Sequence, residues 1–158
     1  MAAKPRHRTI PIQKKWKALK LRSAEVRNAI RALDSSTLFR CPPGELSIVF
    51  MGDEDLARLH DEFFDDPEPT DVITFDGEPD MDFAGEICVS VEHALEYAAR
   101  HRVDFSRELT LYLVHGYLHL SGFDDHDPSA RRRMRTAEKK ALDLLESSDK
   151  LPLFHVVT

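Results

Sequence analysis

Short apolar runs alternate with longer stretches of helical periodicity along this chain. Apolar, β-rich runs at 46–50, 71–75 and 85–90 are bounded by turn residues, which predicts three strands. An edge strand is predicted at 9–12, because Pro11 has no N–H to donate to a neighbouring strand. Apolar positions at helical spacing predict five helices, at 14–33, 53–63, 91–100, 104–122 and 127–145.

The order of these elements predicts an α+β fold. We expect a small mixed sheet of about four strands packed with about five helices. The whole chain, 1–158, suits a single domain, because a chain of 158 residues can bury one hydrophobic core. That core is expected over about 8–146, with a C-terminal tail at 147–158.

Polar residues mark where several of the helices begin and end. Asp53, Asp104 and Asp127 stand where an N-cap is expected, and Pro128 suits the first position of the last helix. Gly122 is a natural stop for the helix before it. That helix carries leucines on most of its sides, which predicts that it is buried.

Composition excludes several classes of protein. With 42% hydrophobic and 32% charged residues, the chain resembles an ordinary globular protein. No apolar run approaches the ~18–20 residues that cross a bilayer, and the N-terminus lacks a secretory signal. We therefore expect a cytoplasmic protein without a membrane partner. Cys41 and Cys88 are expected to be free thiols in that compartment.

Charge is distributed unevenly, although the net value is −6. Residues 1–33 hold ten Lys/Arg and one acid, a net +9, whereas residues 53–92 hold fifteen acids and one base, a net −14. Four arginines crowd one helical turn further on: Arg131, Arg132, Arg133 and Arg135. Such asymmetry is compatible with a basic face that binds a polyanion, and it is equally typical of solvated helix surfaces.

Three histidines near the end of the buried helix suggest a metal centre. His115 and His119 are four residues apart, so an α-helix places both imidazoles on one face. Gly122 lets the chain turn back, and His126 follows that turn. Three protein ligands with an open fourth position are typical of a catalytic zinc site. We therefore predict one Zn²⁺ per chain, held by His115, His119 and His126.

A missing glutamate argues against one class of zinc enzyme. In His-Glu-x-x-His metallopeptidases the residue after the first histidine is the general base. Gly116 stands there in this chain, so a metallopeptidase is the least favoured reading. We expect this glycine to leave room beside the metal for a bulky substrate.

Three segments resemble the YbeY family of bacterial rRNA maturation factors, which are regarded as single-strand-specific endoribonucleases. These are the histidine motif 115–126, the Pro-Thr-Asp segment 69–75 and the strand 85–90, and the likeness spans most of 45–145. The resemblance implies an α+β fold, a zinc ion on three histidines, and roles in 16S rRNA 3′-end maturation, ribosome biogenesis and ribosome quality control. It implies single-stranded regions of 16S rRNA and the small ribosomal subunit or a ribosomal protein as partners. It implies no nucleotide cofactor.

Two departures from the family pattern matter. The third histidine usually stands ten residues after the first, and that place is taken by Asp125, with His126 one residue later. We favour His126 as the ligand, with Asp125 as the alternative, because a turn absorbs one extra residue easily. Second, many members carry an arginine where spacing places Phe64. An arginine there would contact phosphate, so its absence questions how RNA is engaged.

The remaining candidates have less specific roles. Asp124 or Asp125 is a candidate to orient a ligand or accept a proton during catalysis. By family likeness Thr70 and Asp71 are candidates for substrate contact, although Pro-Thr-Asp also suits a turn before a strand. Three arginines of the last predicted helix are candidates to contact phosphate in place of the arginine that Phe64 replaces: Arg131, Arg132 and Arg135. The leading hypothesis is a metal-dependent endoribonuclease, and the alternative is a non-catalytic, zinc-stabilised ribosome-assembly factor.

Overall fold

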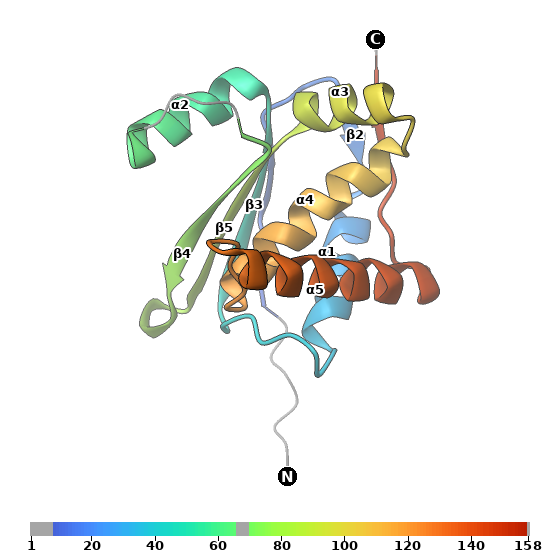
Figure 1. The fold of residues 1–158 in the computed structure, drawn as a ribbon. Helices are drawn as coiled ribbons and strands as arrows, with labels where there is room; N and C mark the ends of the chain where they lie inside the picture. The colour runs from blue at the N-terminus through green and yellow to red at the C-terminus, as the bar shows by residue number, and fades with distance from the viewer. Residues whose placement is uncertain (1–7, 66–69, 158) are drawn as a thin grey trace.

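A computed structural model describes residues 8–65 and 70–157 (Figure 1). Four strands form the main sheet in the order β1-β3-β5-β4. The first three are parallel to one another, and β4 closes one edge antiparallel to β5. Their bounds are Ile12–Lys14 for β1, Glu45–Met51 for β3, Val72–Glu78 for β4 and Phe83–Ser90 for β5.

Alternating side chains on β3 supply two separate apolar clusters. Ile48 and Phe50 point into the main core, whereas Val49 and Met51 point to the other face of the sheet. On that second face they pack with Leu56 of helix α2, Asp53–Phe64. The sheet is therefore covered on both sides, with the larger core on the side away from α2.

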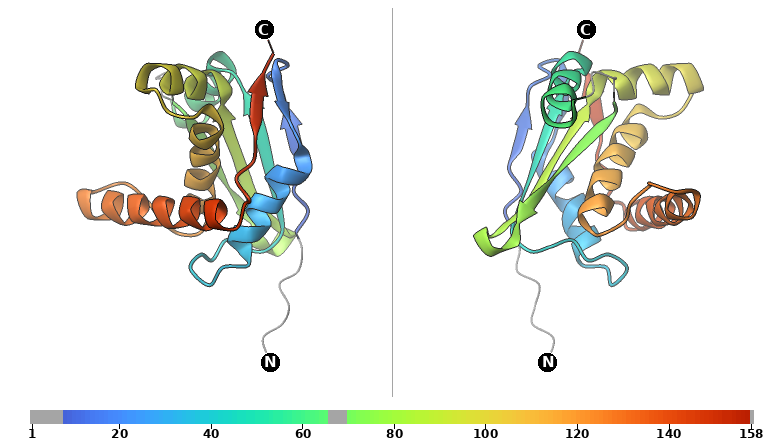
Figure 2. Two further views of the ribbon diagram at one scale, coloured as in Figure 1. Left: turned by 90° about the vertical axis from the view of Figure 1, so that its right-hand side faces the viewer. Right: turned by 60° about the vertical axis from the view of Figure 1, so that its left-hand side comes forward.

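The other four helices lie on the side of the main core, as Figure 2 shows. Helix α4 crosses the sheet and is buried along most of its length, as its leucine pattern predicts. Helix α5 packs on the outside of α4 and against α1, and α3 packs on the N-terminal half of α4. Their bounds are Ser23–Asp34 for α1, Val91–His101 for α3, Phe105–Leu120 for α4 and Pro128–Ser147 for α5.

A small second sheet corrects the prediction of one helix over 14–33. Strand β2, Leu19–Leu21, pairs antiparallel with β6, Phe154–Val156, in the C-terminal tail. The helix α1 begins only at Ser23. Leu19 is fully buried and pairs with Val156, so a contact 137 residues away in sequence overrides the local helical periodicity.

The remaining elements agree with the prediction in kind, with shifts at their ends. Across residues 8–65 and 70–157, the α+β class with four main strands and five α-helices is confirmed. Asp53 is not the N-cap of α2: Gly52 occupies that position, and the Asp53 carboxylate accepts a hydrogen bond from the buried Ser90 hydroxyl. Cys41 and Cys88 are free thiols. Within the described ranges, no helix has the length and apolarity that a bilayer crossing needs.

Candidate metal centre

Helix α4 is held in place at both of its ends. The Asp104 carboxylate accepts a hydrogen bond of 2.9 Å from the Arg107 N–H, as an N-cap does. At the other end Gly122 adopts a φ of 101°, and the N–H of Phe123 donates to the carbonyl of Leu118 at 3.0 Å. This pattern is a Schellman motif, which reverses the chain after the helix. The predicted stop at Gly122 is therefore confirmed.

The side of α4 opposite the two histidines is also anchored. Tyr117 is fully buried, and its hydroxyl donates a hydrogen bond of 2.7 Å to the Asp34 carboxylate. Asp34 in turn pairs with the buried guanidinium of Arg8 at 2.8 Å. Tyr117 lies between His115 and His119 in sequence, so this network fixes the rotation of α4 and the direction of both imidazoles.

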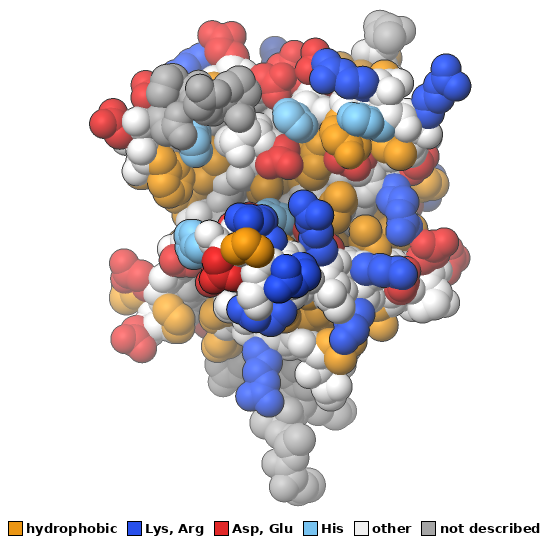
Figure 3. Space-filling model, in the orientation of Figure 1, with side chains coloured by type: hydrophobic (Ala, Val, Ile, Leu, Met, Phe, Trp, Pro, Cys, Tyr) orange, Lys and Arg blue, Asp and Glu red, His pale blue; other side chains and the backbone are white. Residues whose placement is uncertain are grey.

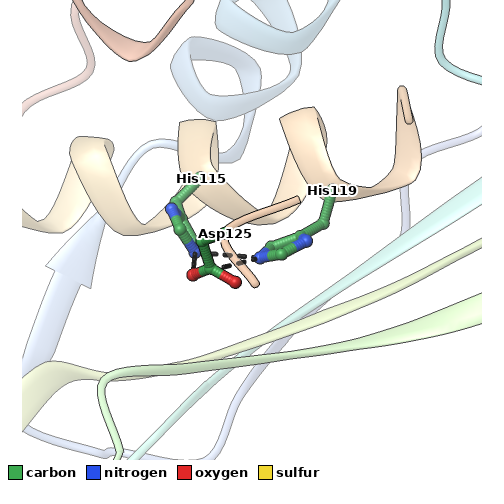
Figure 4. A group of neighbouring side chains, drawn as sticks. All are labelled: His115, His119 and Asp125. Atoms are coloured by element: carbon green, nitrogen blue, oxygen red, sulfur yellow. Dashed lines mark hydrogen bonds and ion pairs between the residues drawn. The ribbon is translucent and has the colours of Figure 1, made fainter. Parts of the chain in front are cut away.

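His115 and His119 converge with Asp125 in one group (Figure 4). The two Nε2 atoms lie 3.1 Å apart. The Asp125 carboxylate lies 3.8 Å from Nε2 of His115 and 4.0 Å from Nε2 of His119. The loop that follows Gly122 delivers this carboxylate, because the Asp127 N-cap of α5 starts the next helix and keeps the loop short.

These separations fit a single divalent ion. Nitrogen ligands at ~2.0–2.1 Å in tetrahedral geometry lie about 3.4 Å apart. The histidine pair is close to that value, and Asp125 needs a movement of about half an ångström to reach it. Imidazole and carboxylate are both ligands of zinc, so the donor set suits that ion as well as other divalent metals.

The structure separates the two candidates for the third ligand. Asp125 is half-buried within the group, whereas His126 is exposed and outside it, although both line the same cleft. The backbone N–H of His126 donates to the Asp124 carboxylate at 3.3 Å, which holds this part of the loop in a tight turn. Asp124 itself is exposed and also lines the cleft.

Glu138 of α5 is a member of the site that the sequence analysis missed. Its carboxylate lies 3.0 Å from Nδ1 of His115. A carboxylate accepts here, so Nδ1 carries the proton and Nε2 is left to face Asp125 and His119. The contact spans 23 residues and two helices, so no local pattern announced it.

The two imidazoles have opposite pKa shifts. Burial lowers the pKa of His115, but the hydrogen bond and charge of Glu138 outweigh it and leave the pKa raised. Burial, together with the positive charge of protonated His115, lowers the pKa of His119. One imidazole of the pair is therefore neutral over a wider range of pH, as a metal ligand must be.

A cleft of about 580 Å³ opens beside the histidine pair. Val72, Thr74 and Asp76 of the edge strand β4 form one wall, and the loop after α4 forms the other. His60 and Phe64 of α2 complete the lining. Phe64, where the resemblance noted in the sequence implies an arginine, is 53% exposed and stacks on Phe75.

The expectation that Gly116 leaves room for substrate beside the metal is wrong. It is buried and faces β5 rather than the cleft, and a Cβ at this position would lie 2.5 Å from Cγ2 of Ile87. The glycine therefore allows α4 to approach the sheet closely. This approach brings the histidines to the edge strand that walls the cleft.

The other predicted site residues do not line the cleft. The charge of Asp71 raises the pKa of His115. The Thr70 hydroxyl donates a hydrogen bond to the carbonyl of Val72, and neither residue lines the cleft. Pro69 lies outside the described residues. Arg131 donates to the carbonyl of Asp125 at 3.4 Å, and Arg135 stands one turn further along α5. Arg132 lies on another face of α5, where it lines a separate pocket.

Several known proteins are similar to this chain. An endoribonuclease YbeY from Protochlamydia amoebophila is 41% identical over 98 residues, which cover 60% of this chain and 65% of the relative, just under two thirds. One from Rhodopirellula baltica is 36% identical over 129 residues, covering 79% and 66%. The solution structure of TM1509 from Thermotoga maritima matches with a TM-score of 0.60 and 23% identity, over 89% of this chain and 91% of that one.

A model of the endoribonuclease YbeY family matches residues 10–146. This match places the chain in a class of proteins that are named endoribonucleases, which are hydrolases of RNA. The chain belongs to the endoribonuclease YbeY family.

Proposed function

We propose that the chain is a metal-dependent endoribonuclease that cuts single-stranded RNA in the cleft between α4 and β4. One observation carries this proposal beyond family membership. Two imidazole nitrogens 3.1 Å apart and a carboxylate within 4.0 Å of both stand at the side of an open cleft. Such a group binds a divalent ion while the cleft leaves one side of it accessible to a phosphodiester.

The metal that we propose is zinc, one ion per chain. Its ligands are His115, His119 and one residue of the loop 124–126. Asp125 is the residue that the geometry supports, and His126 is the one that the sequence pattern favours. A zinc ion at this place would supply Lewis-acid polarisation of a phosphoryl oxygen and of water.

The protein's own groups would complete the reaction. Glu138 keeps the proton of His115 on Nδ1 and orients the ring. Asp124, exposed at the cleft, is placed to accept a proton from the attacking water. Phe64 offers a ring on which an unpaired base can stack, which favours single-stranded RNA over a duplex.

The more specific role that we propose is maturation of the 3′ end of 16S rRNA during ribosome biogenesis and quality control, in the cytoplasm. This rests on the family to which the chain belongs. In that role the partners are the small ribosomal subunit or one of its proteins. The acidic segment 53–92, with a net charge of −14, is complementary in charge to a basic ribosomal protein.

The experiment is cleavage of a labelled single-stranded RNA by zinc-loaded protein. His115→Ala and His119→Ala should each lose at least about a hundredfold in rate, because each removes a ligand of the ion that polarises the phosphate. His101→Ala, an exposed histidine on α3, is the matched control and should keep the wild-type rate. Full activity in both ligand variants would contradict the proposal.

A second candidate is a ribosome-assembly factor without turnover, in which zinc orders the loop after α4. Phe64 at the place of the family's arginine favours it, because an aromatic ring binds bases but does not neutralise phosphate. This candidate predicts RNA binding without cleavage by zinc-loaded protein. Metal-free protein that folded equally well and lost only turnover would exclude it.

A further inference from the structure

A second pocket, of about 350 Å³, lies beside the metal cleft. Phe123, the residue that follows the Gly122 turn, lines both hollows. A smaller hollow joins them: it shares Gly122, Phe123 and Asp124 with the metal cleft, and Phe123 and Arg133 with the second pocket. The three hollows are therefore neighbours that share lining residues, and together, from His115 to α5, they are called the flank groove.

The end of the flank groove on α5 is basic. Arg132, Arg133 and Lys140 line it, and all three are exposed. The Arg133 guanidinium donates to the Ser129 hydroxyl at 2.7 Å, which orients it. In the part of the chain that the structure describes, none of the three forms an ion pair with a carboxylate. Figure 3 shows Lys and Arg side chains gathered over α5.

Apolar side chains lie beside the basic ones. Leu38, in the loop after α1, is 54% exposed, and Phe39 below it is buried against Tyr117. Phe123 contributes a half-buried ring. A pocket with an apolar floor and a rim of cations that pair with no carboxylate of residues 8–65 and 70–157 matches a nucleotide, which combines a flat base with an anionic phosphate. Its volume lies at the lower end of the ~300–1,000 Å³ range for small-ligand sites.

We propose that the flank groove binds the nucleotides of single-stranded RNA that adjoin the bond held in the metal cleft. The inference rests on the proposed function for its substrate. Arg132 and Lys140 contact phosphates, and Leu38 and Phe123 contact bases. The Asp124 carboxylate repels phosphate where the groove leaves the metal cleft, so the RNA backbone runs along the α5 side. The groove therefore supplies positive charge for phosphate, whereas the metal cleft has the uncharged Phe64 where the family resemblance implies an arginine.

The test is equilibrium binding of a fluorescent single-stranded RNA of about ten nucleotides. It is measured by anisotropy in the presence of a chelator, so that no cleavage occurs. The variant Arg132→Ala/Lys140→Ala removes two charges from the groove. The control Arg100→Ala/Lys139→Ala removes two exposed charges from α3 and α5 that line none of its three hollows.

The groove variant should bind about tenfold more weakly than the control at ~0.1 M salt. Its plot of log Kd against log salt should be shallower by about 1.4, since each lost phosphate contact on a single strand changes the slope by about 0.7. Equal Kd and equal slope in the two double variants would overturn the inference.

Cleavage by zinc-loaded wild-type protein, measured in parallel, separates this inference from the proposed function. Cleavage together with equal binding by the two variants would overturn the groove alone. Absence of cleavage together with weaker binding by the groove variant would overturn the nuclease and support the groove as an RNA-binding surface.

Discussion

The carboxylate of Glu138 on α5 lies 3.0 Å from Nδ1 of His115 on α4. This contact links the two helices behind the candidate metal site and sets the tautomer of His115, one of its proposed ligands. Both side chains are largely buried, with 17% and 22% of their surface exposed, so the interaction is shielded from water. Removing a carboxylate that orients a ligating histidine typically weakens metal binding by a factor of roughly ten to a hundred.

Glu138→Ala should therefore lower zinc affinity by about ten- to a hundredfold. Competition with a chromophoric chelator measures this. Glu146→Ala, which breaks the exposed pair of Glu146 with Arg107, is the control and should leave zinc affinity unchanged. Equal zinc affinity in the two variants would show that Glu138 does not orient His115.

Gly116→Ala should destabilise the fold by about 1–3 kcal/mol, because the added Cβ would overpack against Ile87. Denaturant unfolding measures the loss. Ile87→Ala removes the atoms that collide, so the double variant should be more stable than the sum of the two single losses predicts. Strict additivity would mean that α4 is not held to β5 at this point.

Phe64→Ala should raise the KM for single-stranded RNA several-fold, because base stacking on an aromatic ring contributes about 1–3 kcal/mol. The value of kcat should change less, because Phe64 does not touch the metal group. Phe63→Ala, which removes an exposed ring that does not line the cleft, is the matched control. A KM equal to that of the control would remove Phe64 from the substrate path.

The buried carboxyl of Glu108 should make the free energy of unfolding depend on pH. Burial raises the pKa of this carboxyl, which is 8% exposed on the face of α4 that also carries His115. A raised pKa in the folded state means that the protonated carboxyl favours folding below about pH 4 and that this contribution is lost as the pH rises through the folded pKa.

Glu108→Gln should accordingly be more stable than wild type at pH 7, with the difference shrinking toward pH 4. Thermal unfolding across this range measures it, and Glu96→Gln, at an exposed position of α3, is the control. A difference that grew as the pH fell would contradict the assignment.

Local signals were enough to predict much of this molecule. The caps at Asp104 and Asp127 and the turn at Gly122 act over three or four residues, and the structure has all three as predicted. The pairing of His115 with His119 follows from helical spacing alone. Information that lies in distant contacts was not accessible: β2 exists because β6 pairs with it, and Glu138 meets His115 only because α5 packs on α4.

Gly116 shows the same limit inside the motif itself. A glycine beside a predicted ligand could face either the metal or the sheet, and helical periodicity does not say where the sheet lies. The structure places it against Ile87. The third ligand depends likewise on the path of a loop, which brings Asp125 to the pair and leaves His126 outside.

The most direct test of the account is the zinc content of purified, untagged protein, measured by elemental analysis beside His119→Ala, Asp125→Ala and His126→Ala. Wild-type protein should hold about one zinc ion per chain, and His119→Ala should lose it. A loss in Asp125→Ala but not in His126→Ala would assign the third ligand as the geometry places it, and the reverse would assign it to His126. Wild-type protein without metal after chelator-free purification, or full zinc content in His119→Ala, would contradict the metal centre.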